Sequence, residues 1–135
     1  MRVCVLGAGA LGSLTGGYLA EAGIDVTLIG RPAHIDAINS NGLQFVGRRG
    51  EFTVKENLTA ITSADQASGE FDYLILLVKA KDTISALEGA DCLKNRVKCA
   101  FSFQNGIGNE SMLGQWCGAD KVIGAVTVEG AEMVS

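Results

Sequence analysis

The sequence has little of several residue types, and each shortage excludes a class of protein. It holds a single histidine, His34, and its four cysteines form no CxxC pair, so the usual spacing of zinc ligands is absent and we predict no metal site. No apolar run approaches the roughly 18 to 20 residues of a membrane-spanning helix, so we expect no membrane partner. A net charge of −4 with scattered basic residues argues against a nucleic-acid partner.

The apolar run at the start of the chain is interrupted by glycine within six residues. We therefore expect no signal peptide. Cys4 lies inside that run, where it is typical of a small core residue rather than of a disulfide. Together these features favour a reduced, cytoplasmic setting.

What the chain does contain is glycine, with 18 residues against a single proline. The most informative glycines lie in GAGALG, residues 7–12, directly after the apolar run 2–6. Residues 10–23 carry apolar side chains at helical spacing, and residues 25–30 form a second apolar run. A strand, a glycine turn, a helix and a strand within 30 residues predict a right-handed βαβ unit.

In a βαβ unit each glycine of this pattern has its own role. Gly7 permits the tight turn out of the strand, Gly9 lets the backbone approach a diphosphate, and Gly12 lets the helix pack against the strand. The N-terminus of the helix then presents free N–H groups and a partial positive charge. The pattern predicts a dinucleotide diphosphate site, or else a glycine-rich turn that binds nothing; its residues are Gly7, Ala8, Gly9, Ala10, Leu11 and Gly12.

The rest of the chain continues the alternation of strands and helices. We predict one α/β domain over residues 1–135, of the doubly wound Rossmann type, with a mainly parallel sheet and helices on both faces. The predicted helices are 32–42, 81–90 and 109–117. The predicted strands are 58–62, 71–80, 99–108 and 121–131, with a hairpin over 43–55.

The end of the second strand indicates which dinucleotide binds. An acidic residue there would hold the ribose 2′-hydroxyl of NAD, but this sequence has Gly30 and Arg31 at that place. A guanidinium can bind the 2′-phosphate of NADP through paired hydrogen bonds. Arg31 therefore favours NADP (NADPH) over NAD, the alternative being an ordinary surface arginine.

Polar residues follow two other apolar runs, where ligands of such sheets gather. Lys79 follows YLILLV, and it either approaches the cofactor or the substrate or is a surface lysine with a partly buried stem. Asn105 follows AFSFQ, and it either contacts a ribose or a substrate hydroxyl or simply forms a turn with Gly106. His34 fits a surface residue better than an acid–base catalyst.

Four blocks of sequence together resemble the N-terminal domain of the ketopantoate reductases (2-dehydropantoate 2-reductases). The resemblance covers essentially the whole chain; the blocks are MRVCVLGAGALGSLTGGYLAEAGIDVTLIGR, LLVKAKDT, QNGIGN and GAVTVEGA. It implies NADPH-dependent reduction of 2-dehydropantoate, a small 2-keto acid, to pantoate on the route to pantothenate and coenzyme A.

The resemblance also implies roles for single residues. Arg31 would contact the 2′-phosphate, Lys79 would lie near the cofactor, Asn105 would contact both cofactor and substrate, and Ala131 would line the nicotinamide end. The general-acid lysine of the family would lie beyond Ser135, in a helical C-terminal domain, so we expect a truncated chain that is inactive alone. A homodimer is one candidate assembly.

Two rival interpretations of the sequence stay open. One is a reductase of another 2-keto acid in the same family, or a polyol-phosphate or opine dehydrogenase with a similar front half. The other is a non-catalytic module that senses NADP, because the same fold serves many functions.

Overall fold

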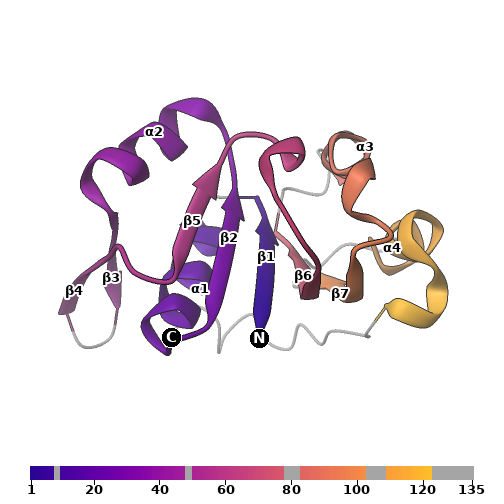
Figure 1. Ribbon diagram of the computed structural model, residues 1–135, viewed down its shortest axis with the longest axis horizontal. Coiled ribbons are helices and arrows are strands. Elements are labelled where there is room, and N and C mark those ends of the chain that lie inside the picture. Colours follow the sequence, from indigo (N-terminus) through magenta and orange to yellow (C-terminus); the bar gives the residue numbers. More distant parts are fainter. Residues whose placement is uncertain (8–9, 48–49, 78–82, 103–108, 123–135) are drawn as a thin grey trace.

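The computed structural model describes residues 1–7, 10–47, 50–77, 83–102 and 109–122. Its centre is a sheet of five parallel strands in the order β5-β2-β1-β6-β7 (Figure 1). The strands are β1 (Arg2–Leu6), β2 (Asp25–Ile29), β5 (Leu58–Ile61), β6 (Phe71–Leu76) and β7 (Val97–Ser102). The chain starts in the middle of the sheet, winds to one edge, and returns to the other side of β1.

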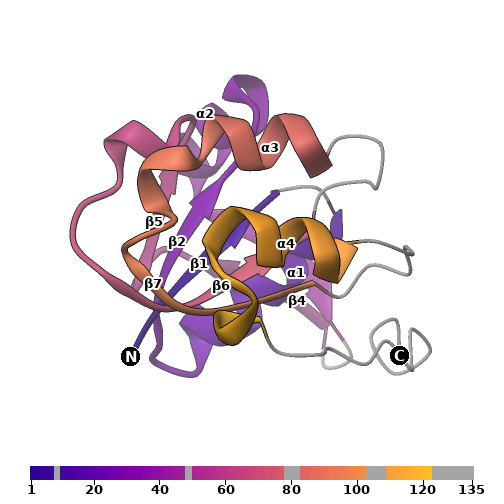
Figure 2. The ribbon, with the colours of Figure 1, turned by 90° about the vertical axis from the view of Figure 1, so that its right-hand side faces the viewer.

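Helices cover both faces of this sheet. They are α1 (Ala10–Glu21), α2 (Pro32–Asn41), α3 (Thr83–Gly89) and α4 (Asn109–Cys117), with short 3₁₀ turns at Ala64–Gln66, Asp91–Leu93 and Ala119–Lys121. Figure 2, turned by 90°, shows α3 and α4 in front of the sheet. The predicted doubly wound Rossmann-type fold is confirmed.

The alternation of side chains along β1 explains the two helical layers. Val3 and Val5 belong to the core under α1 and α2, whereas Cys4 and Leu6 belong to the core under α3 and α4. All four side chains are buried. A central parallel strand must be apolar on both faces, and for that reason residues 3–6 form an uninterrupted apolar run.

A hairpin of two antiparallel strands lies beside the main sheet. Its strands are β3 (Leu43–Gly47) and β4 (Gly50–Val54), which form a sheet of their own and pack against α1 and α2. The hairpin predicted over 43–55 is confirmed. Its buried Leu43 and Val54 extend the core on the α1 and α2 face.

Several predicted boundaries differ from the structure. Strand β6 ends at Leu76 rather than at residue 80, although residues 78–82 lie outside the described part. Strand β7 begins at Val97, two residues before the predicted start, because Val97 pairs with Phe71 while the exposed Lys98 interrupts the apolar pattern. Of the strand predicted over 121–131, the described part holds a parallel bridge between Val122 and Ala100.

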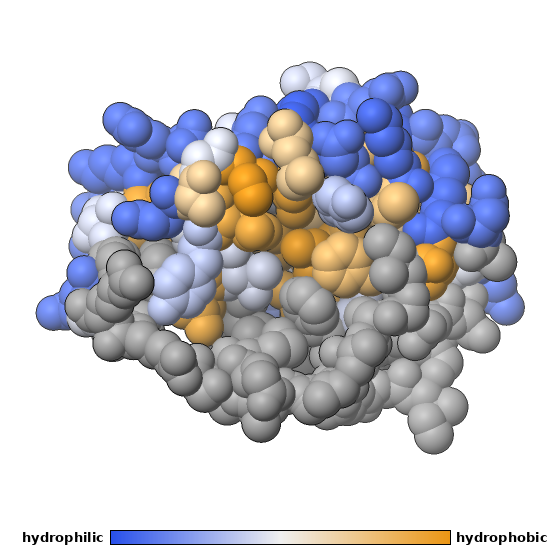
Figure 3. Space-filling model, turned by 90° about the horizontal axis from the view of Figure 1, so that it is seen from below, coloured by the Kyte–Doolittle hydropathy of each residue, from blue (hydrophilic) through white to orange (hydrophobic). Residues whose placement is uncertain are grey.

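The amino ends of the strands are joined by polar contacts. One oxygen of the Asp72 carboxylate accepts a hydrogen bond of 2.8 Å from the backbone N–H of Arg2, and the other lies 3.3 Å from Nζ of Lys98. These residues belong to β6, β1 and β7, so one carboxylate links three neighbouring strands. Seen from below, the described part of the surface shows a central area of apolar residues beside polar ones (Figure 3). Met1 is 70% exposed.

Candidate functional site

The carboxyl ends of β1, β2 and β6 lie side by side, at the end of the sheet opposite to Asp72. The N–H of Gly7 donates to the carbonyl of Ile29 over 3.0 Å, and the N–H of Leu77 donates to the carbonyl of Leu6 over 2.9 Å. The segments that follow β1, β2 and β6 therefore begin next to one another at this end of the sheet. Ligands of open α/β sheets bind in the crevice that such diverging segments form.

Gly7 and Gly12 show why the turn after β1 needs glycine. Gly7 has a φ of 113°, a region that side chains rarely tolerate. A Cβ built on Gly12 would overlap the carbonyl oxygen of Gly7 and would lie 3.7 Å from Cγ1 of Val5. The turn and the close helix–strand packing predicted for these two glycines are thus present.

Helix α1 begins at Ala10, directly after this turn. The first N–H groups of a helix have no partner within it, and with the helix dipole they form a positive end that suits a phosphate. No acidic residue lies in the first turn of α1 to repel an anion. The backbone here has the polarity that a diphosphate requires.

Arg31 follows β2 at the same edge of the sheet. It occupies the N-cap position of α2, and its side chain is exposed without a capping hydrogen bond. Of the two acidic residues nearest in sequence, Asp25 lies at the far end of β2, with its Oδ2 3.2 Å from Nε of Arg2, and Asp36 is an exposed residue of α2. The end of β2 therefore presents a cation and no carboxylate.

The structure brings in one residue that the sequence analysis did not single out. Ser13, in the first turn of α1, has its Oγ 2.8 Å from Nε2 of His34, in the first turn of α2. Ser13 is buried and His34 is exposed. The expectation that His34 lies on the surface is confirmed, but its partner depends on how two helices meet, and no local sequence pattern reports that.

Five predicted site residues lie outside the described residues. Ala8, Gly9, Lys79, Asn105 and Ala131 belong to segments 8–9, 78–82, 103–108 and 123–135. Their proposed contacts stay predictions. The described neighbours nevertheless fix where three of these segments begin: after Gly7, after Leu77 and after the buried Ser102, which pairs with Leu76.

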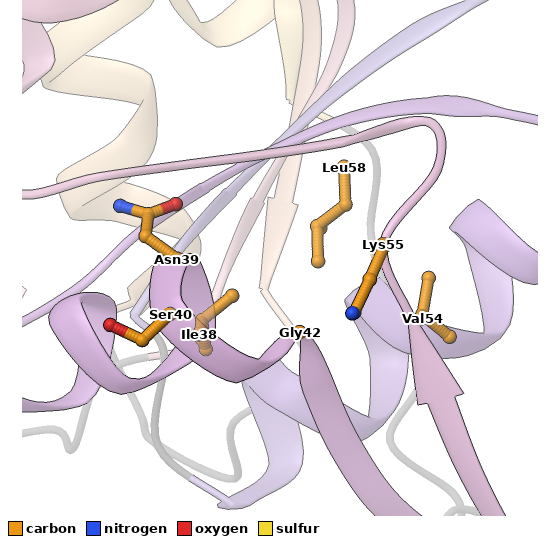
Figure 4. A pocket seen from close by; sticks show the side chains of 7 residues that line it. All are labelled: Ile38, Asn39, Ser40, Gly42, Val54, Lys55 and Leu58. Carbon is orange, nitrogen blue, oxygen red and sulfur yellow. The ribbon is translucent and has the colours of Figure 1, made fainter.

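A pocket of about 190 Å³ lies at a different place (Figure 4). It is formed between the end of α2, the end of β4 and the start of β5; its lining residues are Ile38, Asn39, Ser40, Gly42, Val54, Lys55 and Leu58. The amide of Asn39 already donates to the carbonyl of Ala60 over 3.2 Å. Since Leu58 pairs with Val26 near the amino end of β2, this pocket is remote from the glycine turn.

The described residues offer few other chemical groups. Burial raises the pKa of the Cys4 thiol to about 12, so this thiol stays protonated and is a packing residue. Within the described ranges no group of three or more potential ligands could hold a metal ion. Among the helices described, none is long and apolar enough to cross a membrane.

Comparison with known proteins decides the family. The model of the ketopantoate reductase PanE/ApbA family matches residues 3–135. The chain belongs to the ketopantoate reductase family. The resemblance seen in its four sequence blocks is therefore confirmed.

Individual relatives agree with the family assignment. The 2-dehydropantoate 2-reductase of Pyrococcus abyssi is 43% identical over 133 residues, which is 97% of this chain but 41% of the relative. The solved 2-dehydropantoate 2-reductase of Geobacter metallireducens GS-15 superposes with a TM-score of 0.83 at 30% identity, over 93% of this chain and 41% of that one. This chain thus spans about two fifths of the length of these relatives.

A further solved relative carries a dinucleotide. A ternary complex of D-mandelate dehydrogenase with NADH and anilino(oxo)acetate superposes with a TM-score of 0.78 at 26% identity, over 93% of this chain and 40% of that one. The fold of this chain is thus shared by a protein that was solved with a bound dinucleotide.

Proposed function

We propose that this chain binds NADPH and that the complete protein reduces 2-dehydropantoate to pantoate in the cytoplasm. The family and its curated relatives support the reaction. The observation that carries the choice of cofactor is the end of β2, where Arg31 is exposed and no carboxylate is present. In this proposal, pantoate formation serves the synthesis of pantothenate and coenzyme A.

The described residues fit the proposed cofactor at two points. Gly7 places no side chain at the end of β1, and Gly12 lets α1 pack closely against that strand, so the arrangement suits a diphosphate at the N-terminus of α1. Arg31 offers a planar guanidinium that matches a phosphate monoester. Residues 8–11 would complete the diphosphate turn, and Lys79, Asn105 and Ala131 would lie toward the nicotinamide.

When bound, the reduced nicotinamide supplies a hydride to the ketone carbon of the substrate. The work of this chain is to hold both partners in a near-attack arrangement. Asn105 is proposed to hydrogen-bond both cofactor and substrate, since its amide donates and accepts. The proton for the new hydroxyl would come from the lysine that the family resemblance places beyond Ser135.

The choice of cofactor is tested by calorimetric titration of the complete protein with NADPH and NADH. We expect NADPH to bind more tightly, and Arg31→Ala to lose roughly ten- to a hundredfold in NADPH affinity, because a hydrogen bond to a charged group contributes about 1.5–3 kcal/mol. NADH affinity should change little. The control Lys55→Ala removes an exposed positive charge at the amino end of the sheet and should leave both affinities unchanged.

A second candidate is an NADH-dependent reductase of another 2-keto acid. The similarity to a D-mandelate dehydrogenase that was solved with NADH favours it. Tighter binding of NADH than of NADPH by the wild-type protein would select this candidate. An unchanged cofactor preference in Arg31→Ala would contradict the role proposed for this residue.

A further inference from the structure

Two helices that start at the proposed cofactor site are tied together by a side-chain contact. Ser13 Oγ, in the first turn of α1, lies 2.8 Å from His34 Nε2, in the first turn of α2. Ser13 follows Gly12 directly, and His34 follows Arg31 by three residues. The contact therefore joins the helix behind the glycine turn to the helix that begins at the arginine.

The contact can form in either neutral state of the imidazole. If Nε2 carries the proton it donates to the Ser13 hydroxyl, and if Nδ1 carries it the hydroxyl donates to Nε2. Ser13 is only 7% exposed, so its hydroxyl loses a hydrogen bond that water does not fully replace when the ring is removed. The pair is thus a structural tie in both tautomers.

The first turn of α2 has few other polar attachments among the described residues. Arg31, the N-cap, makes no side-chain capping hydrogen bond. The far end of α2 is held separately, since Asn39 Nδ2 donates to the carbonyl of Ala60 in β5. Ile35 and Ile38 bury the inner face of the helix. His34 is therefore the polar side chain that fixes the end of α2 nearest to Arg31.

We propose that the Ser13–His34 pair sets the spacing between the diphosphate turn and Arg31, so that His34 is a positioning residue for NADPH selectivity. This inference rests on the proposed function. The diphosphate is attached to the 5′ oxygen and the extra phosphate to the 2′ oxygen of the same adenosine ribose, so the groups that bind them must lie at a matching separation. The pair fixes the start of α2, from which Arg31 extends, so less of the chain around Arg31 has to be ordered when its guanidinium binds a phosphate.

The consequence is specific to the phosphorylated cofactor. NADH has a 2′-hydroxyl in place of the phosphate, so its affinity does not depend on how Arg31 is held. His34→Ala is expected to lower NADPH affinity about three- to tenfold, the range expected when one more group has to be ordered on binding. It should leave NADH affinity within about twofold of wild type.

The test is calorimetric titration of the complete protein with NADPH and NADH, in the wild type and in five variants. His34→Ala and Ser13→Ala should each lower the ratio of NADPH to NADH affinity, and the double variant should lower it no further than either single one. His34→Gln should retain most of the ratio, because its amide can still hydrogen-bond to Ser13. Asn39→Ala, which loosens the other end of α2, should retain the ratio fully.

Each outcome has a distinct meaning. A wild-type preference for NADPH that survives in both His34→Ala and Ser13→Ala overturns this inference alone, as does an equal loss in Asn39→Ala. If His34→Ala does not fold, Ser13→Ala carries the test. If the wild-type protein binds neither dinucleotide, or shows no preference for NADPH, the proposed cofactor fails and the inference fails with it.

Discussion

Gly12 is the residue at which the close approach of α1 to β1 depends on a single missing atom. A Cβ there would overlap the Gly7 carbonyl oxygen. Its neighbour one turn later, Gly16, is different: a Cβ at Gly16 would lie 3.6 Å from side-chain carbons of Leu28 and Val26, an ordinary contact distance. Position 12 of this helix thus requires glycine, whereas position 16 has room for a methyl group.

This difference gives a matched pair of variants. Gly12→Ala should lower the free energy of unfolding by about 1–3 kcal/mol or more, since the helix must move away from the strand. Gly16→Ala should leave it unchanged or raise it by up to about 1 kcal/mol, because alanine favours a helix. Urea denaturation of both variants measures this. Equal stability of the two would contradict the packing described for Gly12.

The sequence could predict the glycine turn and Arg31 because both belong to a local pattern. A strand, a glycine motif and a helix follow one another without a gap, and Arg31 stands where the second apolar run ends. Ser13 and His34 are 21 residues apart in the sequence and meet only when the folded chain brings the first turns of α1 and α2 together. Such a contact depends on tertiary packing, so it required the structure.

At the scale of elements, the carboxylate of Asp72 links three strands at the amino end of the sheet. The backbone N–H of Arg2 and the Lys98 side chain both hydrogen-bond to it, and in that order they hold its pKa below the ordinary value of 3.8. A carboxyl with a lowered pKa stabilises the folded state while it is ionised. Its contribution is present above the ordinary value and is lost as the pH falls through the lowered one.

We therefore expect Asp72→Asn to be less stable than wild type above about pH 5, with the difference shrinking as the pH falls below about 4. Urea denaturation of both proteins between pH 3 and 7 checks this. The control Glu56→Gln removes an exposed carboxylate in the turn before β5 and should show no such convergence. A stability difference that stays constant down to pH 3 would count against the proposed link.

The order of the helices and strands could be predicted from the sequence, but some of their bounds and the short 3₁₀ turns could not. The runs at 2–6 and 25–30 correspond to β1 and to β2, which ends at Ile29, because every residue after the first in each of these two strands is buried. The sequence pattern predicts too late a start for β7, because the exposed Lys98 interrupts the apolar residues of this strand. The 3₁₀ turns Ala64–Gln66 and Asp91–Leu93 are too short to show a periodicity.

At the scale of the whole molecule, the chain spans about two fifths of the length of its curated relatives. We expect the complete protein to oxidise NADPH when 2-dehydropantoate is added, and residues 1–135 alone to show no turnover, because the proposed proton donor lies beyond them. Absorbance of the reduced cofactor follows both reactions. Turnover by residues 1–135 alone would place the proton donor within them.

The proposed function requires that the glycine turn and Arg31 together bind a phosphorylated dinucleotide. A crystal structure with NADPH tests it most directly. We expect the diphosphate against the N-terminus of α1, beside Gly7 and Gly12, and the 2′-phosphate within hydrogen-bond distance of the Arg31 guanidinium. Cofactor density at another place, or a 2′-phosphate that points away from Arg31, would contradict the proposed cofactor site.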